Sequence, residues 1–157
     1  VDTLINAYAA GKSVTFPRPS YDGRWLLYSY ADFGCFPINH KEADLWLMDL
    51  QDGSTHPLER ANSSYCESFH NWSSDSHWIL FASRRGDSLY SRIYIAQIDE
   101  KGNASKPFLL PQKDPDFYHK TLFTFNVPDF TSEKVNFRIR GAYEEAFSDE
   151  RVQVTVK

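Results

Sequence analysis

Hydrophobic residues in this chain fall into short runs that repeat with a period near 50. Asp22 and Trp25, which belong to the first turn and the first clear apolar run, recur 53 positions later as Asp75 and Trp78. Apolar positions agree across the two copies, while the polar stretches that follow them differ in length. A repeat of this length is typical of propeller blades or another stacked array.

The alternation within each copy predicts four short strands. Residues 44–50 alternate with period two, as in a strand with one face buried. The Asp22-Gly23 pair lies between two apolar runs, which is the pattern of a tight hairpin. The predicted strands are residues 3–8, 13–16, 25–30, 44–50, 56–59, 65–72, 78–83, 92–98 and 107–110. Four strands in up-and-down order form one propeller blade.

The chain therefore divides into two blades and two flanking segments. We predict an all-β fold, a partial β-propeller of two four-stranded antiparallel blades with a short β-rich C-terminal segment. A propeller ring has roughly four to eight blades. Missing blades or self-association are therefore expected to cover the exposed sheet edges. The predicted units are residues 1–16 (end of a preceding blade and an incoming strand), 17–60 (first blade), 61–112 (second blade) and 113–157 (C-terminal extension).

The C-terminal extension does not repeat the blade pattern. Residues 121–127 form a predicted strand, and alternating apolar residues at 135–139 and 152–156 indicate further strands. Residues 142–147 can form one or two helical turns. This segment is expected to pair with the free edge of a blade.

Composition supports the strands and weighs against both a nucleic-acid partner and a membrane-spanning segment. Aromatic residues make up 16% of the chain, and large rings favour strands. The formal net charge of −4 provides no broad basic field, which weighs against a nucleic-acid partner. The chain contains no run of 18 apolar residues, so we expect no membrane-spanning segment.

The repeat resembles that of TolB-type β-propellers. The likeness covers about residues 13–112 and is carried by residues 19–29 with 44–50, and by residues 72–83 with 93–96. More narrowly, residues 16–20, 40–45 and 106–112 are similar to the C-terminal blades of the TolB-like proteins common in Bacteroidetes. Ser76 departs from the glycine usual in the second turn. The resemblance implies a six-bladed propeller, a periplasmic or otherwise extracytoplasmic location, and binding of other proteins rather than catalysis.

The sequence contains none of the familiar catalytic or cofactor motifs. The five histidines lack metal-ligand spacing, no serine lies in a G-x-S-x-G elbow, and no phosphate-binding glycine loop occurs. We therefore predict no metal, no cofactor and no enzyme activity. Asp22 and Asp75 are interpreted as turn caps. His70, on a predicted innermost strand, is interpreted as a structural histidine.

The loops after the second strand of each blade carry the most unusual residues. In a four-stranded blade these loops and the loop leading into the next blade open on the same face, where aromatic and arginine side chains favour recognition. The alternative is that the rings plug the end of the blade and the arginines pair with nearby carboxylates. Cys35 and Cys66 lie on this face and either form a disulfide or are unrelated buried thiols. The candidate binding residues are Phe33, Phe36, His40, Tyr65, Arg84, Arg85, Tyr90 and Arg92.

These observations predict a non-catalytic protein-binding or scaffold module whose partners belong to the cell envelope. One alternative is the propeller of a larger oligopeptidase-like hydrolase, with catalysis elsewhere. Another is a propeller that binds a small molecule or a carbohydrate. A fold alone does not decide among them.

Overall fold

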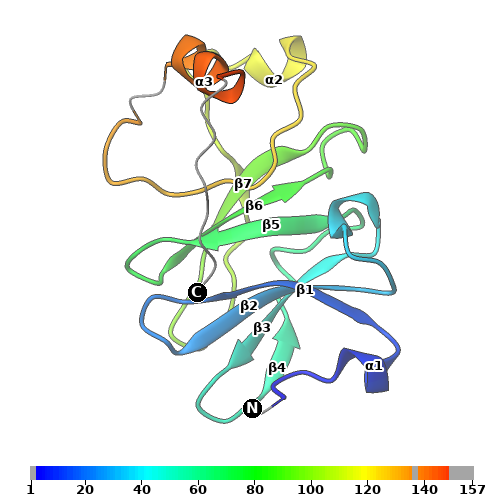
Figure 1. Ribbon diagram of the computed structural model, residues 1–157. Coiled ribbons are helices and arrows are strands. Elements are labelled where there is room, and N and C mark those ends of the chain that lie inside the picture. The colour runs from blue at the N-terminus through cyan, green and yellow to red at the C-terminus, as the bar shows by residue number, and fades with distance from the viewer. Residues whose placement is uncertain (1–2, 136–137, 149–157) are drawn as a thin grey trace.

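The computed structural model describes residues 3–135 and 138–148, and its architecture is two stacked four-stranded sheets (Figure 1). The first sheet has the order β1-β2-β3-β4 and the second β5-β6-β7-β8, with antiparallel pairing throughout. The predicted all-β fold with blade-like sheets is therefore confirmed. The strands are β1 (Ser13–Pro19), β2 (Trp25–Ala31), β3 (Asp44–Asp49), β4 (Thr55–Pro57), β5 (Glu67–Trp72), β6 (Trp78–Ser83), β7 (Arg92–Gln97) and β8 (Phe108–Leu109).

One hydrophobic cluster joins the two sheets. Trp25 and Leu27 on β2 and Leu45 and Leu47 on β3 face β6 and β7 of the second sheet, where Phe81 belongs to the same buried cluster. Side chains alternate along a strand, so the intervening residues point to the opposite faces. The apolar run of each repeat thus covers both faces of its sheet, as expected for strands inside a stack.

The opposite face of the first sheet carries a smaller cluster. Leu26, Tyr28 and Met48 are buried there, and Ile5 of the N-terminal segment packs against them. Leu26 and Tyr28 correspond in the repeat to Ile79 and Phe81, which are the residues that bury against the first sheet.

The opposite face of the second sheet is covered by the segment that follows β8. Leu80, Ala82 and Ile93 belong to a buried cluster against which Phe125 and Phe130 pack. The C-terminal segment therefore occupies the side of β5–β8 that faces away from the first sheet.

Both innermost strands contain a bulge at the same place in the repeat. Phe16 in β1 and Phe69 in β5 have positive φ angles, and the pairing register shifts at both sites. Their rings meet edge to face at 4.9 Å between centroids. β1 continues through Pro17 and Pro19, beyond the predicted end at residue 16, because an edge strand with a bulge tolerates proline.

The predicted strand over residues 3–8 is wrong, because a short helix, α1 (Ala7–Ala10), forms there. The Asn6 side chain accepts a hydrogen bond from the Ala9 N–H, and Gly11 closes the helix in the left-handed region at φ 61°. These are a helix N-cap and a glycine C-cap.

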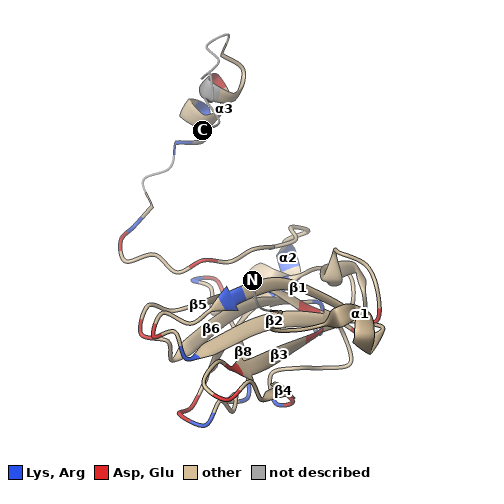
Figure 2. Ribbon diagram, turned by 60° about the horizontal axis from the view of Figure 1, so that its bottom comes forward, with Lys and Arg blue, Asp and Glu red and all other residues tan. Residues whose placement is uncertain are grey.

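The predicted strands of the described C-terminal segment are also wrong. Residues 121–127 run without regular secondary structure, since β8 has only two residues and offers no long edge to pair with. Instead, α2 (Phe117–Lys120) and α3 (Ile139–Ala146) form, and the latter includes most of the predicted helical turn at 142–147. Predicted strand residues at 136–137 and 152–156 lie outside the described residues. Figures 1 and 2 both place α3 away from the two sheets.

Candidate functional site

Three connections meet at one end of the two sheets and form the surface that we call the loop face. They are residues 32–43 between β2 and β3, residues 58–66 between β4 and β5, and residues 84–91 between β6 and β7. A short 3-10 helix, Pro37–Asn39, lies in the first of them. The same end of the stack lies on the right in Figure 1.

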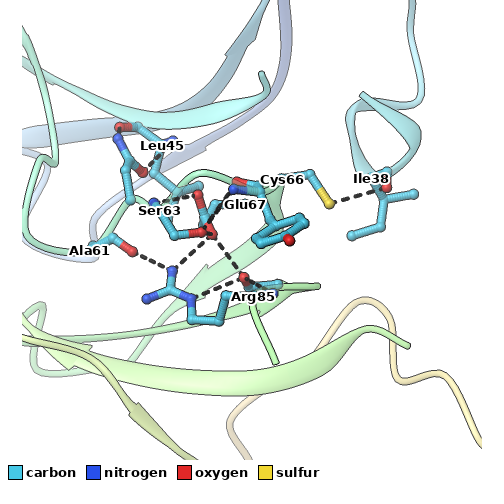
Figure 3. Close-up of polar contacts among 10 residues, drawn as sticks. Ile38, Leu45, Ala61, Ser63, Cys66, Glu67 and Arg85 are labelled. Atoms are coloured by element: carbon cyan, nitrogen blue, oxygen red, sulfur yellow. Dashed lines mark hydrogen bonds and ion pairs between the residues drawn. The ribbon is translucent and has the colours of Figure 1, made fainter. Parts of the chain in front are cut away.

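A buried carboxylate joins two of these connections, residues 58–66 and residues 84–91 (Figure 3). Glu67 at the start of β5 has no exposed surface. Its carboxylate accepts hydrogen bonds from the Ser63 hydroxyl at 2.6 Å, the Ser83 hydroxyl at 2.7 Å and the Arg85 guanidinium at 2.9 Å. Arg85 also donates to the carbonyl of Ala61. These donors supply the hydrogen bonds that a buried carboxylate requires.

Asp44 carries a perturbed carboxyl beside this network. Burial at the start of β3, together with the negative charge of Glu67, raises the pKa of Asp44 from 3.8 to about 6. Asp44 belongs to no ion pair with another residue of the described part of the chain. Asp44 is therefore a group whose ionisation is disfavoured by the fold.

The two predicted phenylalanines project into solvent. Phe33 is 65% exposed and Phe36 is 61% exposed. Leu89, on the 84–91 loop, is 69% exposed. The ring of His40 contacts the Phe33 ring edge to face at 4.5 Å, and its Nδ1 lies 3.6 Å from a Glu42 carboxylate oxygen. The rings do not plug the end of the blade.

Arg84 and Tyr65 line a pocket of about 150 Å³ where the three connections meet. The Arg84 guanidinium donates weakly to the Asn39 side chain at 3.4 Å. The ammonium of Lys41 lies 5.1 Å from the centre of the Tyr65 ring. The remaining lining residues are Ile38, Cys66 and Ser88.

Arg85 and Arg92 are engaged within the chain, as the alternative interpretation expected. Arg85 pairs with Glu67 and lies over the Tyr94 ring at 4.7 Å. Arg92 is 4% exposed, donates to the carbonyls of the C-terminal segment at Phe123 and Tyr118, and has its guanidinium 5.0 Å from the ring of Tyr90. Arg92 thus anchors the C-terminal segment, and neither Arg92 nor Tyr90 lines the pocket.

The disulfide between Cys35 and Cys66 does not form. Cys35 lies exposed in the 32–43 loop, whereas Cys66 is buried and donates its thiol proton to the Ile38 carbonyl at 3.2 Å. Burial raises the pKa of the Cys66 thiol. The shared face was a correct inference, but the two thiols lie at different depths on it.

His70 is a structural side chain, as predicted from its place on the innermost strand. Its Nε2 lies 2.7 Å from the Phe16 carbonyl and 3.2 Å from the Leu27 carbonyl, which links β5 to the first sheet. Complete burial lowers the pKa of His70 to about 4. In the described part of the chain, no cluster of His, Cys, Asp and Glu side chains could hold a metal ion.

The aspartate turns have the capping role that the sequence predicted. Asp22 accepts hydrogen bonds from the Ser20 hydroxyl at 2.5 Å and the Arg24 N–H at 3.1 Å. Ser76, which replaces glycine in the second turn, has φ 62° and accepts the Asp22 N–H at 3.0 Å. The unusual serine therefore joins the two turns.

Other parts of the site have no signal in the sequence. The serines that hold Glu67 resemble any other loop or strand serine. Ser88, which has a positive φ of 64° and lines the pocket, is equally unremarkable in the sequence. Glutamate at the start of a strand is ordinarily exposed. Only the folded contacts identify Glu67 as buried.

None of the described helices has the length and hydrophobicity to cross a membrane. No family model and no curated protein matches this chain. Among solved structures, a prolyl endopeptidase from a study of inter-domain dynamics in catalysis and specificity is similar over 69% of this chain and 22% of its own length, with 16% sequence identity and a TM-score of 0.33. This chain thus spans about a fifth of that protein. A similarity this low carries no assignment, so the blade-like fold rests on the sheet order and the repeat described above.

Proposed function

We propose that this chain is a non-catalytic protein-binding module of an extracytoplasmic TolB-like propeller, with the loop face as its contact surface. The observation that carries the proposal is the exposure of three large apolar side chains, Phe33, Phe36 and Leu89, on two adjoining loops. Exposed aromatic residues grouped on a rigid scaffold are characteristic of recognition surfaces.

The support beneath the loops favours binding. The Glu67 network ties Ser63 and Arg85 to the start of β5 and the end of β6, so this part of the loop face is held in one arrangement before any partner arrives. Preorganisation of this kind reduces the entropy lost on association. The buried Cys66 thiol, with its raised pKa, is poorly suited to act as a nucleophile, which agrees with a non-catalytic role.

The same proposal includes a further sheet on the outer face of β1–β4. In the repeat, this outer face of the first sheet corresponds to the face of the second sheet that packs against the first sheet. Trp46 and Tyr30 remain only half-buried there. We expect the chain either to self-associate or to bind further sheets of the same kind through this face. If the chain self-associates, its sedimentation should show concentration-dependent association that Trp46→Glu weakens. A monomer at every concentration contradicts self-association through this face.

The binding role is tested by photo-crosslinking followed by affinity measurement. A photoreactive residue at position 36 should capture an envelope protein, and the same residue at Tyr21, which is 69% exposed in the turn between β1 and β2 at the opposite end of the sheet, should not. The captured protein is then titrated against Phe36→Ala, with Tyr21→Ala as the matched control. Loss of a central aromatic contact should weaken binding by about tenfold or more. Equal affinity of the two variants contradicts the proposal.

A further inference from the structure

The pocket between Arg84, Lys41 and Tyr65 has the chemistry of an anion site. Both basic side chains line it, and its lining contains no acidic residue. Within the described residues, neither Lys41 nor Arg84 belongs to an ion pair. Two unpaired cations at one concave site attract a negative group.

One guanidinium nitrogen of Arg84 has no hydrogen-bond partner among the described residues. The Nε of Arg84 is buried and makes no hydrogen bond, while its Nη2 reaches only the Asn39 amide oxygen at 3.4 Å. A buried N–H without an acceptor costs free energy until a ligand satisfies it. The Nε and one Nη of a guanidinium lie side by side and match the two oxygens of a carboxylate.

We propose that this pocket binds a carboxylate, namely an aspartate or glutamate side chain of the protein partner, and this inference rests on the proposed function. Arg84 donates to the carboxylate, and Lys41 adds a second positive charge at the rim. Tyr65 and Ser88 also line the pocket, and each side chain carries a hydroxyl group that can donate.

The size of the pocket selects a side chain rather than a free cofactor. A volume of about 150 Å³ holds a few water-sized groups, whereas pockets for whole small molecules enclose roughly 300–1,000 Å³. Ile38 and Cys66 supply apolar wall for the methylene groups of an acidic side chain.

The pocket is built before a ligand binds. The Ser88 N–H donates to the Arg84 carbonyl at 2.9 Å, which closes a backbone turn over residues 84–88. Cys66 is fixed by its hydrogen bond to Ile38, and the neighbouring Arg85 is fixed by Glu67. The ligand therefore meets positioned donors and does not have to order a loop.

The test uses nuclear magnetic resonance of the ¹⁵N-labelled chain at low ionic strength. The Arg84 Nε–H signal and the backbone amide signals of Tyr65 and Ser88 are followed during titration with N-acetylglutamate N-methylamide. The matching glutamine derivative has the same shape without the charge. We expect saturable shifts with the first probe and none with the second.

Three variants complete the test. Arg84→Gln and Lys41→Gln should each raise the dissociation constant of the glutamate probe, with Arg84→Gln raising it about tenfold or more. Lys41 is exposed, so its variant keeps the test valid even if Arg84→Gln disturbs folding. Arg60→Gln removes the same charge from an exposed position outside the pocket and should leave binding unchanged.

The outcomes separate this inference from the proposed function. Absence of saturable shifts, equal shifts with both probes, or equal weakening by Arg60→Gln overturns the carboxylate site. If the probe fails to bind while Phe36→Ala still weakens the partner, only the carboxylate site is refuted. If the probe binds while Phe36→Ala has no effect, the proposed function fails and the anion pocket stands.

Discussion

The contact between Gly102 and Trp25 joins the two sheets at a position that the repeat duplicates. Gly102 has φ 79°, and a Cβ added there would lie 2.8 Å from the Cη2 atom of Trp25 and 3.1 Å from a methyl of Leu47. Gly53 is its counterpart in the first sheet, with φ 76° and no atom within 4 Å of an added Cβ. The two glycines have nearly the same backbone and differ in their surroundings.

Alanine at these two positions separates backbone strain from packing. Gly53→Ala should cost only the left-handed conformation, about 1–2 kcal/mol. Gly102→Ala bears the same strain and also forces the buried Trp25 to move, and overpacking of a core adds about 1–3 kcal/mol. We therefore expect Gly102→Ala to be less stable than Gly53→Ala by about 1–3 kcal/mol.

Urea unfolding followed by far-ultraviolet circular dichroism measures the difference. With a slope of about 1–3 kcal/mol per molar urea, the midpoint of Gly102→Ala should lie roughly 1 M below that of Gly53→Ala. Equal midpoints would refute the inference that the tryptophan seated on Gly102 helps to hold the sheets together. They would instead mean that both positions only require a glycine backbone.

Three further substitutions test buried ionisable groups. The pKa of His70 is lowered to about 4 in the folded chain, so the unfolded chain takes up the proton first as the pH falls. The free energy of unfolding should therefore decrease by up to about 3 kcal/mol between pH 6.5 and pH 4. In His70→Gln the pH dependence of the urea midpoint should be weaker. Asp44 has the opposite pH dependence, because its raised pKa lowers the free energy of unfolding as the pH rises from 3.8 to about 6. Asp44→Asn should therefore be about 1–2 kcal/mol more stable than the parent at pH 7 and equally stable at pH 3.5. Glu67→Gln leaves the Arg85 guanidinium without its carboxylate and should lower the free energy of unfolding by about 3 kcal/mol. The control is Glu59→Gln at an exposed position. Equal urea midpoints for the two variants would show that the network does not stabilise the fold.

The regular part of the fold could be predicted because its physical signals are local. Apolar alternation and the aspartate turns defined β2, β3, β6 and β7 to within a residue or two, and the 53-residue offset showed that the two sheets are equivalent. The edge strand β1 was harder to predict, since a bulge at Phe16 allows prolines that would exclude a central strand.

The tail shows why period-two alternation alone is insufficient. Residues 121–127 have the composition of a strand, but a strand requires a partner with free backbone groups. The Phe125 N–H bonds to the Ser91 carbonyl, and its ring packs on the second sheet, so tertiary contacts override the local preference. Burial of Glu67 and the pairing of Arg85 with it were likewise decided by long-range contacts, which the sequence does not display.

Phe125 and Phe130 pack over the second sheet, so the two outer faces of the stack differ. In repeat proteins the terminal units differ from the interior ones because they must present a finished surface to water. Here the segment after β8 covers the side of β5–β8 where an identical unit would otherwise add, while the opposite end retains a face of the kind that accepts one. The described residues thus cover one outer face of the stack and leave the other open, an arrangement that would oppose unlimited head-to-tail growth into fibres.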